Sequence, residues 1–332
     1  MAEQKLVSGF WASLHKPIMA LAPMANVTDA AFRRVIAKYG KPDVMWTEFV
    51  SADGLCSAGQ EKLLPDFWFT DAERPIVAQI FGANPSTMAT ATELIVKLGF
   101  DGVDINMGCP DRAVERQGAG AALIKNPELA KKIILAVKKA AGKLPVSVKT
   151  RIGYGRNTLA EWLPHLLETE LAAVTIHART RKEMSDVPAH WDAVVAAASI
   201  RDKLKSKTLI LGNGDVANLD EAKKRVAETG CDGVMIGRGI FGNPWLFGRK
   251  SPLPNLPHQG EGIDEKFRVM IEHTELFQKL FAGVKNFEVI KKHFKAYVTG
   301  FDGAKELRAK LMDAGTVAEI EAICHKFRVL VK

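Results

Sequence analysis

The sequence predicts an α/β protein, a TIM (β/α)8 barrel followed by a small C-terminal all-helical domain. The chain has 332 residues, of which 47% are hydrophobic and 25% are charged, as expected of a large folded protein. Eight short apolar or β-branched runs alternate with amphipathic segments over residues 18–247, which is typical of parallel strands joined by crossover helices. Beyond a Pro- and Gly-rich segment the strand signals stop, and only helical patterns remain.

The eight runs define the expected barrel. The predicted strands are residues 18–23, 44–48, 76–81, 102–106, 146–151, 173–177, 209–212 and 234–237. The segments between them carry apolar residues at helical spacing, for example at 85–97, 128–141 and 218–229. A doubly wound sheet is the main alternative, but Pro23-Met24-Ala25-Asn26 stands where its G-x-G-x-x-G turn is expected. The pattern therefore favours the barrel.

The proline- and glycine-rich segment at 251–262 is interpreted as a linker. It divides the chain into a catalytic barrel domain at 1–250 and a helical domain at 263–332. The helices expected in the second domain are 264–281, 287–298, 304–314 and 317–330, which together would form a small bundle.

Residues 285–310 combine seven Lys or Arg residues and three acids with interleaved aromatic rings. This mixture is typical of a nucleic-acid-binding surface. The alternative is a bundle in which the aromatic side chains form the core and the lysines face water. The formal net charge of +8 is compatible with both interpretations, because a lysine-rich surface gives a basic protein even without a polyanionic partner.

The sequence contains no run of roughly 18 apolar residues, the length needed to span a bilayer. Its first 16 residues lack the apolar centre of a signal peptide. We therefore expect a cytoplasmic protein that does not bind a membrane, and we expect it to be a monomer. The four cysteines are far apart and form no C-x-x-C pair, so that neither a metal site nor a disulfide framework is predicted.

Polar residues are concentrated where the predicted strands end, which is where the catalytic groups of a (β/α)8 barrel lie. These residues are Gln79, Asn106, Cys109, Lys149, Arg151, His177, Arg179, Asn213, Asp215 and Arg238. Val146 and Val148 alternate along the strand, and Lys149 is the next residue. We expect its side chain to point into the barrel, where a charge is costly unless it meets a partner. A bound anionic or electron-rich ligand would supply that partner.

Paired glycines follow the last two strands and predict a phosphate site. Gly212 and Gly214 follow the seventh strand, and Gly237 and Gly239 flank Arg238 after the eighth. Glycines allow backbone amides to approach phosphate oxygens, and the loops after strands seven and eight form the common phosphate site of such barrels. The alternative is ordinary turn glycines. The matching positions favour a phosphate-bearing cofactor.

FMN suits the predicted site. Lys149 and Gln79 could meet the electron-rich pyrimidine side of a flavin, while Pro23 and Met24 offer an apolar edge. His177 could act in acid-base chemistry or bind the cofactor by a hydrogen bond, and we interpret it as a ligand-binding residue.

Cys109 is the residue that most directly suggests a reaction. Lone cysteines are commonly small buried hydrophobic residues, and that interpretation suits Cys56, Cys231 and Cys324. Cys109 instead lies between Gly108 and Pro110 at the catalytic end of a strand. With an ordinary pKa of about 8.5 its thiol is mostly protonated at neutral pH, so that it could donate a proton.

These residues resemble the tRNA-dihydrouridine synthases, a family of FMN-dependent TIM-barrel enzymes with a C-terminal helical domain. The resemblance spans nearly the whole chain, and Asn106-Met107-Gly108-Cys109-Pro110 is its most specific element. The other segments that carry it are Ala22-Pro23-Met24-Ala25, Gln79-Ile80-Phe81-Gly82, Gly118-Ala119-Gly120, Val148-Lys149-Thr150-Arg151, His177-Ala178-Arg179-Thr180-Arg181, Gly212-Asn213-Gly214-Asp215 and Gly237-Arg238-Gly239.

The resemblance implies a role for each matching residue. The positions that match cofactor contacts are Pro23, Met24, Gln79, Lys149, His177, Asn213, Gly214, Asp215, Gly237 and Arg238. Cys109 matches the active-site cysteine, Asn106 would lie beside the target base, and Arg151 and Arg179 would face the RNA. RNA binding then becomes the better account of residues 285–310, with Lys291, Lys292 and Lys295 as the expected phosphate contacts.

The implied reaction is reduction of the C5–C6 double bond of a uridine in tRNA. NADPH would reduce the FMN, the flavin would pass hydride to C6, and Cys109 would protonate C5. The target nucleotide must leave its stack to reach the flavin. No metal is implied.

The sequence departs from the family at residues 182–191, where an expected aromatic residue and glycine are absent. The departure concerns how RNA sits over that loop rather than the flavin site. Three alternatives stay open: the same reaction on ribosomal RNA, reduction of a free pyrimidine or enone, and an RNA-binding protein with a vestigial flavin site. The basic helical domain argues against a small substrate, and the intact Cys109 and Lys149 argue against a vestigial site.

Overall fold

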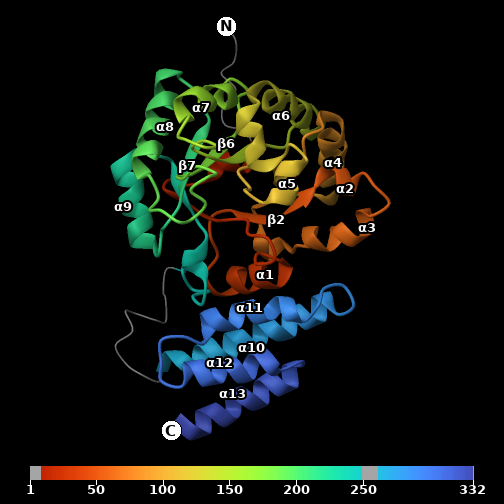
Figure 1. The fold of residues 1–332 in the computed structure, drawn as a ribbon, viewed down its shortest axis with the longest axis vertical. Coiled ribbons are helices and arrows are strands. Elements are labelled where there is room, and N and C mark those ends of the chain that lie inside the picture. The colour runs from red at the N-terminus through yellow and green to blue at the C-terminus, as the bar shows by residue number, and fades with distance from the viewer. Residues whose placement is uncertain (1–8, 249–260, 332) are drawn as a thin grey trace.

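The computed structural model describes residues 9–248 and 261–331. Eight parallel strands form one sheet in the order β1-β8-β7-β6-β5-β4-β3-β2. The two ends of this sheet meet through a bridge between Ala20 of β1 and Val44, next to β2. The strands therefore curl into a TIM-type barrel surrounded by helices, as Figure 1 shows, and the predicted fold class is confirmed.

All eight predicted strands are present. They are β1 (Ile18–Leu21), β2 (Met45–Ser51), β3 (Ile76–Phe81), β4 (Gly102–Met107), β5 (Val146–Arg151), β6 (Ala173–His177), β7 (Leu209–Asn213) and β8 (Gly233–Ile236). The prediction for the first strand was too long, since β1 ends before Pro23, which has no N–H to donate to a neighbouring strand. The bounds of β3, β5 and β6 agree with the prediction.

Helices cover the outside of the barrel. Those in the described part of the barrel region are α1 (Ala30–Tyr39), α2 (Ala52–Leu55), α3 (Gln60–Leu63), α4 (Pro85–Leu98), α5 (Arg112–Arg116), α6 (Pro127–Ala141), α7 (Leu159–Leu167), α8 (Trp191–Lys203) and α9 (Leu219–Thr229). Asn84 and Asn126 cap α4 and α6 by accepting backbone hydrogen bonds, and each is followed by a proline. These are strong helix-start signals, and they explain why both helices begin within one residue of the prediction.

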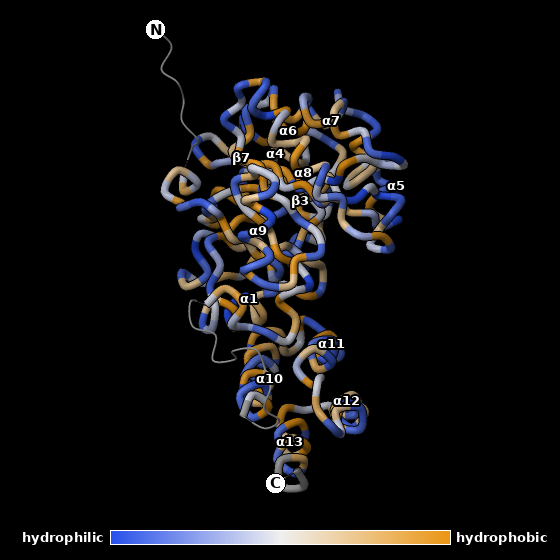
Figure 2. Tube along the Cα trace, turned by 90° about the vertical axis from the view of Figure 1, so that its left-hand side faces the viewer, coloured by the Kyte–Doolittle hydropathy of each residue, from blue (hydrophilic) through white to orange (hydrophobic). Residues whose placement is uncertain are grey.

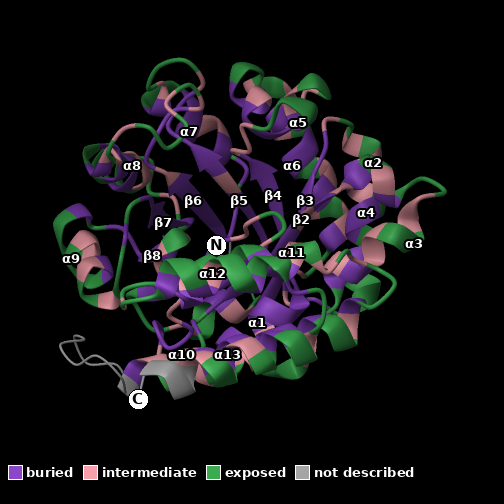
Figure 3. Cartoon of the chain, turned by 60° about the horizontal axis from the view of Figure 1, so that its bottom comes forward, coloured by how far each residue is buried: buried purple, intermediate pink, exposed green. Residues whose placement is uncertain are grey.

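The strands are buried along almost their whole length, as Figure 3 shows. One end of the barrel interior is closed by Trp11, whose ring centroid lies 6.0 Å from that of Trp46 on β2. Leu211 and Met235 belong to the same apolar cluster. This packing leaves the opposite end, where the carboxyl ends of the strands lie, for polar residues.

Four helices follow the barrel: α10 (Glu261–Phe281), α11 (Glu288–Tyr297), α12 (Ala304–Asp313) and α13 (Val317–Val331). Most of the predicted linker lies outside the described residues, but its last two residues are helical, because α10 already begins at Glu261. Within the described ranges, no helix combines the length and apolar character required to cross a bilayer.

The four helices share their core with the barrel. Ala30, Ala31 and Val35 of α1, together with Trp245, belong to the same buried cluster as the aromatic side chains of α10 and α11. Figures 1 and 2 both show α1 between the barrel and these helices. A polar contact reinforces this packing, since Lys285 after α10 donates to Glu48 of β2 at 3.0 Å. The helical domain is thus held next to the ends of β1 and β2.

Candidate active site

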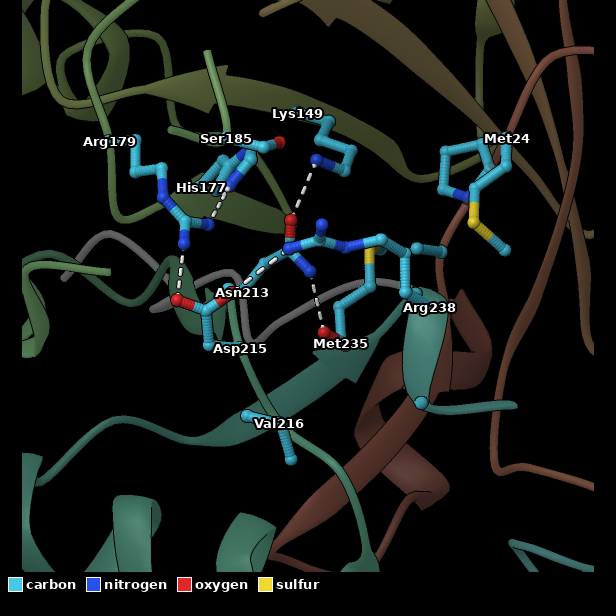
Figure 4. A pocket seen from close by; sticks show the side chains of 15 residues that line it. Met24, Lys149, His177, Arg179, Ser185, Asn213, Asp215, Val216, Met235 and Arg238 are labelled. Atoms are coloured by element: carbon cyan, nitrogen blue, oxygen red, sulfur yellow. Dashed lines mark hydrogen bonds and ion pairs between the residues drawn. The ribbon is translucent and has the colours of Figure 1, made fainter. Parts of the chain in front are cut away.

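A cavity of about 240 Å³ opens at the carboxyl ends of the strands (Figure 4). The residues that line it are Ala22, Pro23, Met24, Lys149, His177, Arg179, Ser185, Asn213, Gly214, Asp215, Val216, Met235, Gly237, Arg238 and Gly239. They come from five strand ends, those of β1, β5, β6, β7 and β8, and from the loop after β6. Nine of the ten predicted cofactor residues, all except Gln79, therefore line one cavity.

Lys149 projects from β5 into this cavity, where its Nζ donates to Asn213 Oδ1 at 3.1 Å. Asn213 is itself oriented, because its Nδ2 donates to the Met235 carbonyl at 2.7 Å. Burial, and secondly the charge of Arg151, lower the pKa of Lys149 to about 8. The ammonium thus has one neutral partner, and an electron-rich ligand would stabilise its charged form.

His177 lies at the end of β6 with Arg179 against it. The Arg179 Nη1 lies 3.2 Å from His177 Nε2, and a guanidinium can only donate, so that Nε2 accepts and the ring proton is on Nδ1. Burial and the neighbouring cations lower the pKa of His177 to about 2. His177 is therefore neutral at physiological pH and presents an N–H donor, which agrees with ligand binding rather than with proton donation by an imidazolium.

The loop after β7 carries Asp215, whose carboxylate contacts both Arg179 and Arg238. These ion pairs lower the pKa of Asp215, with the Arg179 hydrogen bond as the largest cause. A carboxylate repels a phosphate, so that a phosphate would meet the two arginines rather than Asp215 itself. Asp215 lines the cavity and holds these arginines, and its predicted cofactor contact stays a prediction.

Three of the four glycines after the last two strands, Gly212, Gly214 and Gly239, lie where a Cβ would not fit, whereas Gly237 has room for one. A Cβ on Gly214 would approach Ala189 Cβ to 2.8 Å, and its φ of +132° is one that L residues rarely adopt. A Cβ on Gly212 would lie 2.4 Å from the ring of Trp191. The indole N–H of Trp191 donates to the Gly214 carbonyl at 3.0 Å, which fixes the loop after β7 from outside.

Cys109 follows β4 and lies next to the cavity, outside the residues that line it. Its backbone N–H donates to Asn106 Oδ1 at 2.9 Å, and its carbonyl accepts from Ala121 N at 3.0 Å. The residue is half-buried, and burial raises the pKa of the thiol above its ordinary value. The thiol is therefore protonated at neutral pH, as a proton donor requires.

Gln79 is fully buried and is absent from the cavity lining. Both ends of its amide are engaged, since Nε2 donates to Asp104 at 2.7 Å and Oε1 accepts from Asn106 at 3.0 Å. The expected direct flavin contact by Gln79 is therefore not evident in this geometry. Gln79 instead connects β3 to the strand that carries Cys109.

The two arginines expected to face RNA point inward. Arg151 is buried, and its guanidinium donates to the carbonyls of Gly108, Thr180 and Met184 at 2.9 to 3.0 Å. Arg179 is also buried and contacts His177 and Asp215. In this structure their donors hold the loops after β4, β6 and β7 together, and RNA contact by either arginine stays a prediction.

The three lysines of α11 have different environments. Lys292 and Lys295 are exposed, as a phosphate contact requires. Lys291 is only 5% exposed, donates to the Met312 carbonyl at 2.8 Å and pairs with Glu288. The ammonium of Lys291 is thus bound within the four C-terminal helices, and a phosphate contact by Lys291 stays a prediction without support from this geometry.

Sequence reasoning missed several residues of the site. Ser185 lines the cavity from the atypical loop, and nothing in the sequence pointed to it. In that loop Glu183 accepts from the Thr180 N–H at 2.8 Å and lies 3.1 Å from His190 Nε2, so that polar contacts replace the missing aromatic residue and glycine. Asp104 had a recognisable signal, an acid inside an apolar strand that needs a partner.

Two further expectations concern cysteines and metals. Cys231 and Cys324 are buried as expected, but Cys56 is exposed, so that the expectation of a buried hydrophobic role is wrong for it. Among the residues that the structure describes, no group of three or more His, Cys, Asp or Glu side chains is arranged to hold a metal ion.

Comparison with known proteins agrees with this geometry. The family described as dihydrouridine synthase (Dus) matches residues 20–331. A probable tRNA-dihydrouridine synthase of Staphylococcus aureus (strain COL) is 40% identical over 321 residues, which cover 96% of this chain and 95% of that protein. A probable tRNA-dihydrouridine synthase 2 of Bacillus subtilis (strain 168) is 39% identical over 324 residues, covering 97% of each.

Among solved structures, histamine dehydrogenase from Rhizobium sp. 4-9 is similar with a TM-score of 0.52 and 13% identity. The match covers 78% of this chain and 48% of that one, and at this identity it concerns the fold alone. The family match and the two full-length relatives carry the assignment: this chain belongs to the dihydrouridine synthase family.

Proposed function

We propose that the protein is a tRNA-dihydrouridine synthase that uses FMN and NADPH to reduce the C5–C6 bond of a uridine, with Cys109 as the proton donor. Family membership supports the reaction and the oxidoreductase class. The observation that carries the finer assignment is the cavity at the strand ends, which has a half-buried cation on one side and a protonated thiol beside it.

The donor set of the cavity fits a flavin with a phosphate tail. Lys149 has a depressed pKa and one neutral hydrogen-bond partner, so an electron-rich ring edge would stabilise its charge. Gly214 and Gly237 bring backbone close to the cavity, and Arg238 adds a cation that is 62% exposed. Pro23 and Met24 would cover an apolar ring face. When bound and reduced, FMN supplies the hydride that the reaction needs.

Cys109 supplies the proton in this proposal. The thiol is neutral at physiological pH because burial raises its pKa, and the side-chain Oδ1 of Asn106 holds the Cys109 backbone in place. The proton passes from the Cys109 Sγ to C5 of the base, and solvent returns a proton to the resulting thiolate.

Exposed lysines of α11 support an RNA substrate. Lys292 and Lys295 are exposed on a helix that shares its buried cluster with α1 of the barrel, and their charges would attract RNA phosphates. A folded tRNA would be held by shape and charge while the target base leaves its stack.

The test is mass-spectrometric measurement of dihydrouridine in tRNA that lacks the modification, after incubation with FMN-loaded protein and NADPH. We expect uridine to gain two hydrogens with the wild-type protein and not with Cys109→Ala. Absence of any gain on tRNA, despite bound flavin that NADPH reduces, would contradict the proposal. Ribosomal RNA and then free pyrimidines would be the next substrates to assay, since both are alternatives left open by the sequence.

A further inference from the structure

A chain of buried hydrogen bonds runs from the barrel interior to the backbone of Cys109. Asp104 lies between Gln79 of β3 and Ser147 of β5, its register partners on the two neighbouring strands. Ser147 Oγ donates to Asp104 Oδ1, and Gln79 Nε2 donates to Asp104 Oδ2 at 2.7 Å. Asp104 is only 1% exposed and is therefore shielded from water.

The chain continues toward the active site through Asn106. Asn106 Nδ2 donates to Gln79 Oε1 at 3.0 Å. Asn106 Oδ1 then accepts from the backbone N–H groups of Gly108 at 3.1 Å and Cys109 at 2.9 Å. The side chain of Asn106 is thereby shared between Gln79 and the loop that carries the thiol.

The direction of every bond in this chain is determined by its two ends. Burial raises the pKa of Asp104 to about 6, so that its carboxyl group is mostly ionised at neutral pH. An ionised carboxylate can only accept, and a backbone N–H can only donate. Gln79 must therefore turn its nitrogen to Asp104 and its oxygen to Asn106, and Asn106 must turn its oxygen to the Cys109 loop. A donor placed at position 104 would reverse both amides and point an NH2 group at the N–H groups of Gly108 and Cys109.

We propose that Asp104 is a positioning residue, which acts through the ordered amides of Gln79 and Asn106 to hold the Cys109 thiol in place. The functional meaning of this inference rests on the proposed role of Cys109 as proton donor. The position of the thiol can be measured without substrate or flavin, so that the two proposals can fail separately.

The experiment measures the alkylation rate of Cys109 by iodoacetamide across pH, resolved by peptide mass spectrometry. Exposed Cys56 in the same protein serves as an internal reference. Asp104→Asn leaves one oxygen for the two donors Ser147 and Gln79; with that oxygen on Ser147, the new NH2 faces Gln79 and the Cys109 loop loses its acceptor. We expect Cys109 to react about tenfold faster than in the wild type while Cys56 is unchanged. Dihydrouridine formation by FMN-loaded protein should fall in parallel.

A double variant that exchanges the acid and the amide distinguishes a reversal of the hydrogen bonds from a general loss of stability. Combining Asp104→Asn with Gln79→Glu moves the carboxylate to position 79, where it accepts from the amides at both 104 and 106. Every bond of the chain then has a donor and an acceptor again, and one negative charge is retained. We expect this double variant to fold and to alkylate Cys109 within about twofold of the wild-type rate, because the coupling between the two sites is restored.

Ser147→Ala is the matched control, because it removes a bond to the same carboxylate without reversing any amide. It should lower the stability of the fold and leave Cys109 alkylation unchanged. The inference is overturned if Asp104→Asn alkylates as the wild type does, or if Ser147→Ala has an equal effect. It is also overturned if the double variant resembles the single one or does not fold. If Asp104→Asn itself does not fold, the Cys109 alkylation rates of the double variant and of Ser147→Ala still test the inference.

Discussion

Burial changes the protonation equilibria of Cys109 and Lys149, the two residues on which the proposed chemistry depends, in the same sense. In both cases the neutral form is favoured, since burial raises the pKa of the thiol and lowers that of the ammonium to about 8. The neutral thiol of Cys109 carries the proton that the reaction needs. The ammonium of Lys149 is close to losing its proton, so that an electron-rich ligand would stabilise its charged form. The consequences differ and can be measured separately.

Replacing Cys109 with alanine should slow dihydrouridine formation by a factor of about 100 to 10,000, the usual contribution of a positioned general acid. Flavin binding should not change, because Cys109 does not line the cavity. The measurements are single-turnover rates on tRNA and a flavin titration. Cys56→Ala is the control and should behave as the wild type, since Cys56 is exposed on α2's C-terminal side. An active Cys109→Ala protein would require a different proton donor.

The affinity for FMN should fall as the pH rises through about 8. Lys149 has its pKa lowered to about 8 in the free protein, so that it is charged below this pH and progressively neutral above it. A ligand that prefers the charged form binds more tightly below that pKa and raises it, which places the loss of affinity at and above pH 8. A fluorescence titration of FMN between about pH 7 and pH 9.5 measures this.

The same titration with Lys149→Gln should show weaker binding, by about 1.5 to 3 kcal/mol, and no pH dependence in this window. Lys143→Gln, at an exposed position, is the control and should keep the wild-type profile. A wild-type profile that stays flat up to pH 9.5 would exclude Lys149 as the cation that meets the ligand.

At the level of elements, helix α11 has a buried apolar face and an exposed basic face, although apolar and basic residues alternate along its sequence. Ile290, Phe294 and Tyr297 face the core of the helical domain, whereas Lys292 and Lys295 are exposed. Lys291 lies at the edge of the apolar face and donates to the Met312 carbonyl at the end of α12. One lysine therefore supports the fold and two are available to a polyanion.

Lys292→Ala and Lys295→Ala should each weaken tRNA binding and reduce the salt dependence of log affinity by about one, without changing stability. Lys291→Ala should lower the free energy of unfolding by about 1 to 3 kcal/mol, because it leaves a carbonyl without its donor. Filter binding at several salt concentrations and urea denaturation measure the two effects. Equal effects of all three substitutions on RNA affinity would contradict this division.

The elements of this fold were predictable because their signals are local. Pairs such as Asn126-Pro127 mark a helix start, and Val146 to Arg151 is a strand in both prediction and structure. The burial of Lys291 was predictable, since its position one residue after Ile290 places it beside the apolar face of a helix. The partner of Asp104 was not predictable, because it depends on the register of β3, β4 and β5.

The cavity could likewise be predicted only in part. The glycines and the basic residues at strand ends predicted its lining, because in a barrel these ends converge whatever the connecting helices do. Whether a polar side chain then faces the cavity or a neighbouring loop depends on packing. Arg151 and Arg179 have the sequence features of RNA contacts, yet they bind carbonyls and Asp215 inside the protein.

In the whole molecule, the barrel and the helical domain share a core through α1 and Trp245. Trp245 is 3% exposed, and its ring lies 5.8 Å from that of Tyr39. A shared core predicts that the two parts unfold together. Trp245→Ala should therefore cost about 3 to 5 kcal/mol and move a single transition to lower denaturant concentration.

Guanidinium denaturation followed by circular dichroism and by tryptophan fluorescence tests this, since both signals should change together. Trp68→Ala is the comparison, because Trp68 is 37% exposed and stacks on Phe281, so that a smaller loss of about 1 kcal/mol is expected. A helical part that melts first while the barrel persists would show that the shared core does not couple them.

The two oxygens of the Glu48 carboxylate contact different parts of the molecule, one in the barrel and one at the C-terminal helices. Oε1 accepts from the backbone N–H of Asn26, in the loop that places Met24 at the cavity, and Oε2 accepts from Lys285 of the helical domain. A displacement of either segment would therefore move the partner of the other. By thermodynamic reciprocity, any factor by which tRNA changes the flavin dissociation constant is also the factor by which flavin changes that of tRNA. Glu48 thus connects the loop at the cavity to the segment after α10 through a single carboxylate.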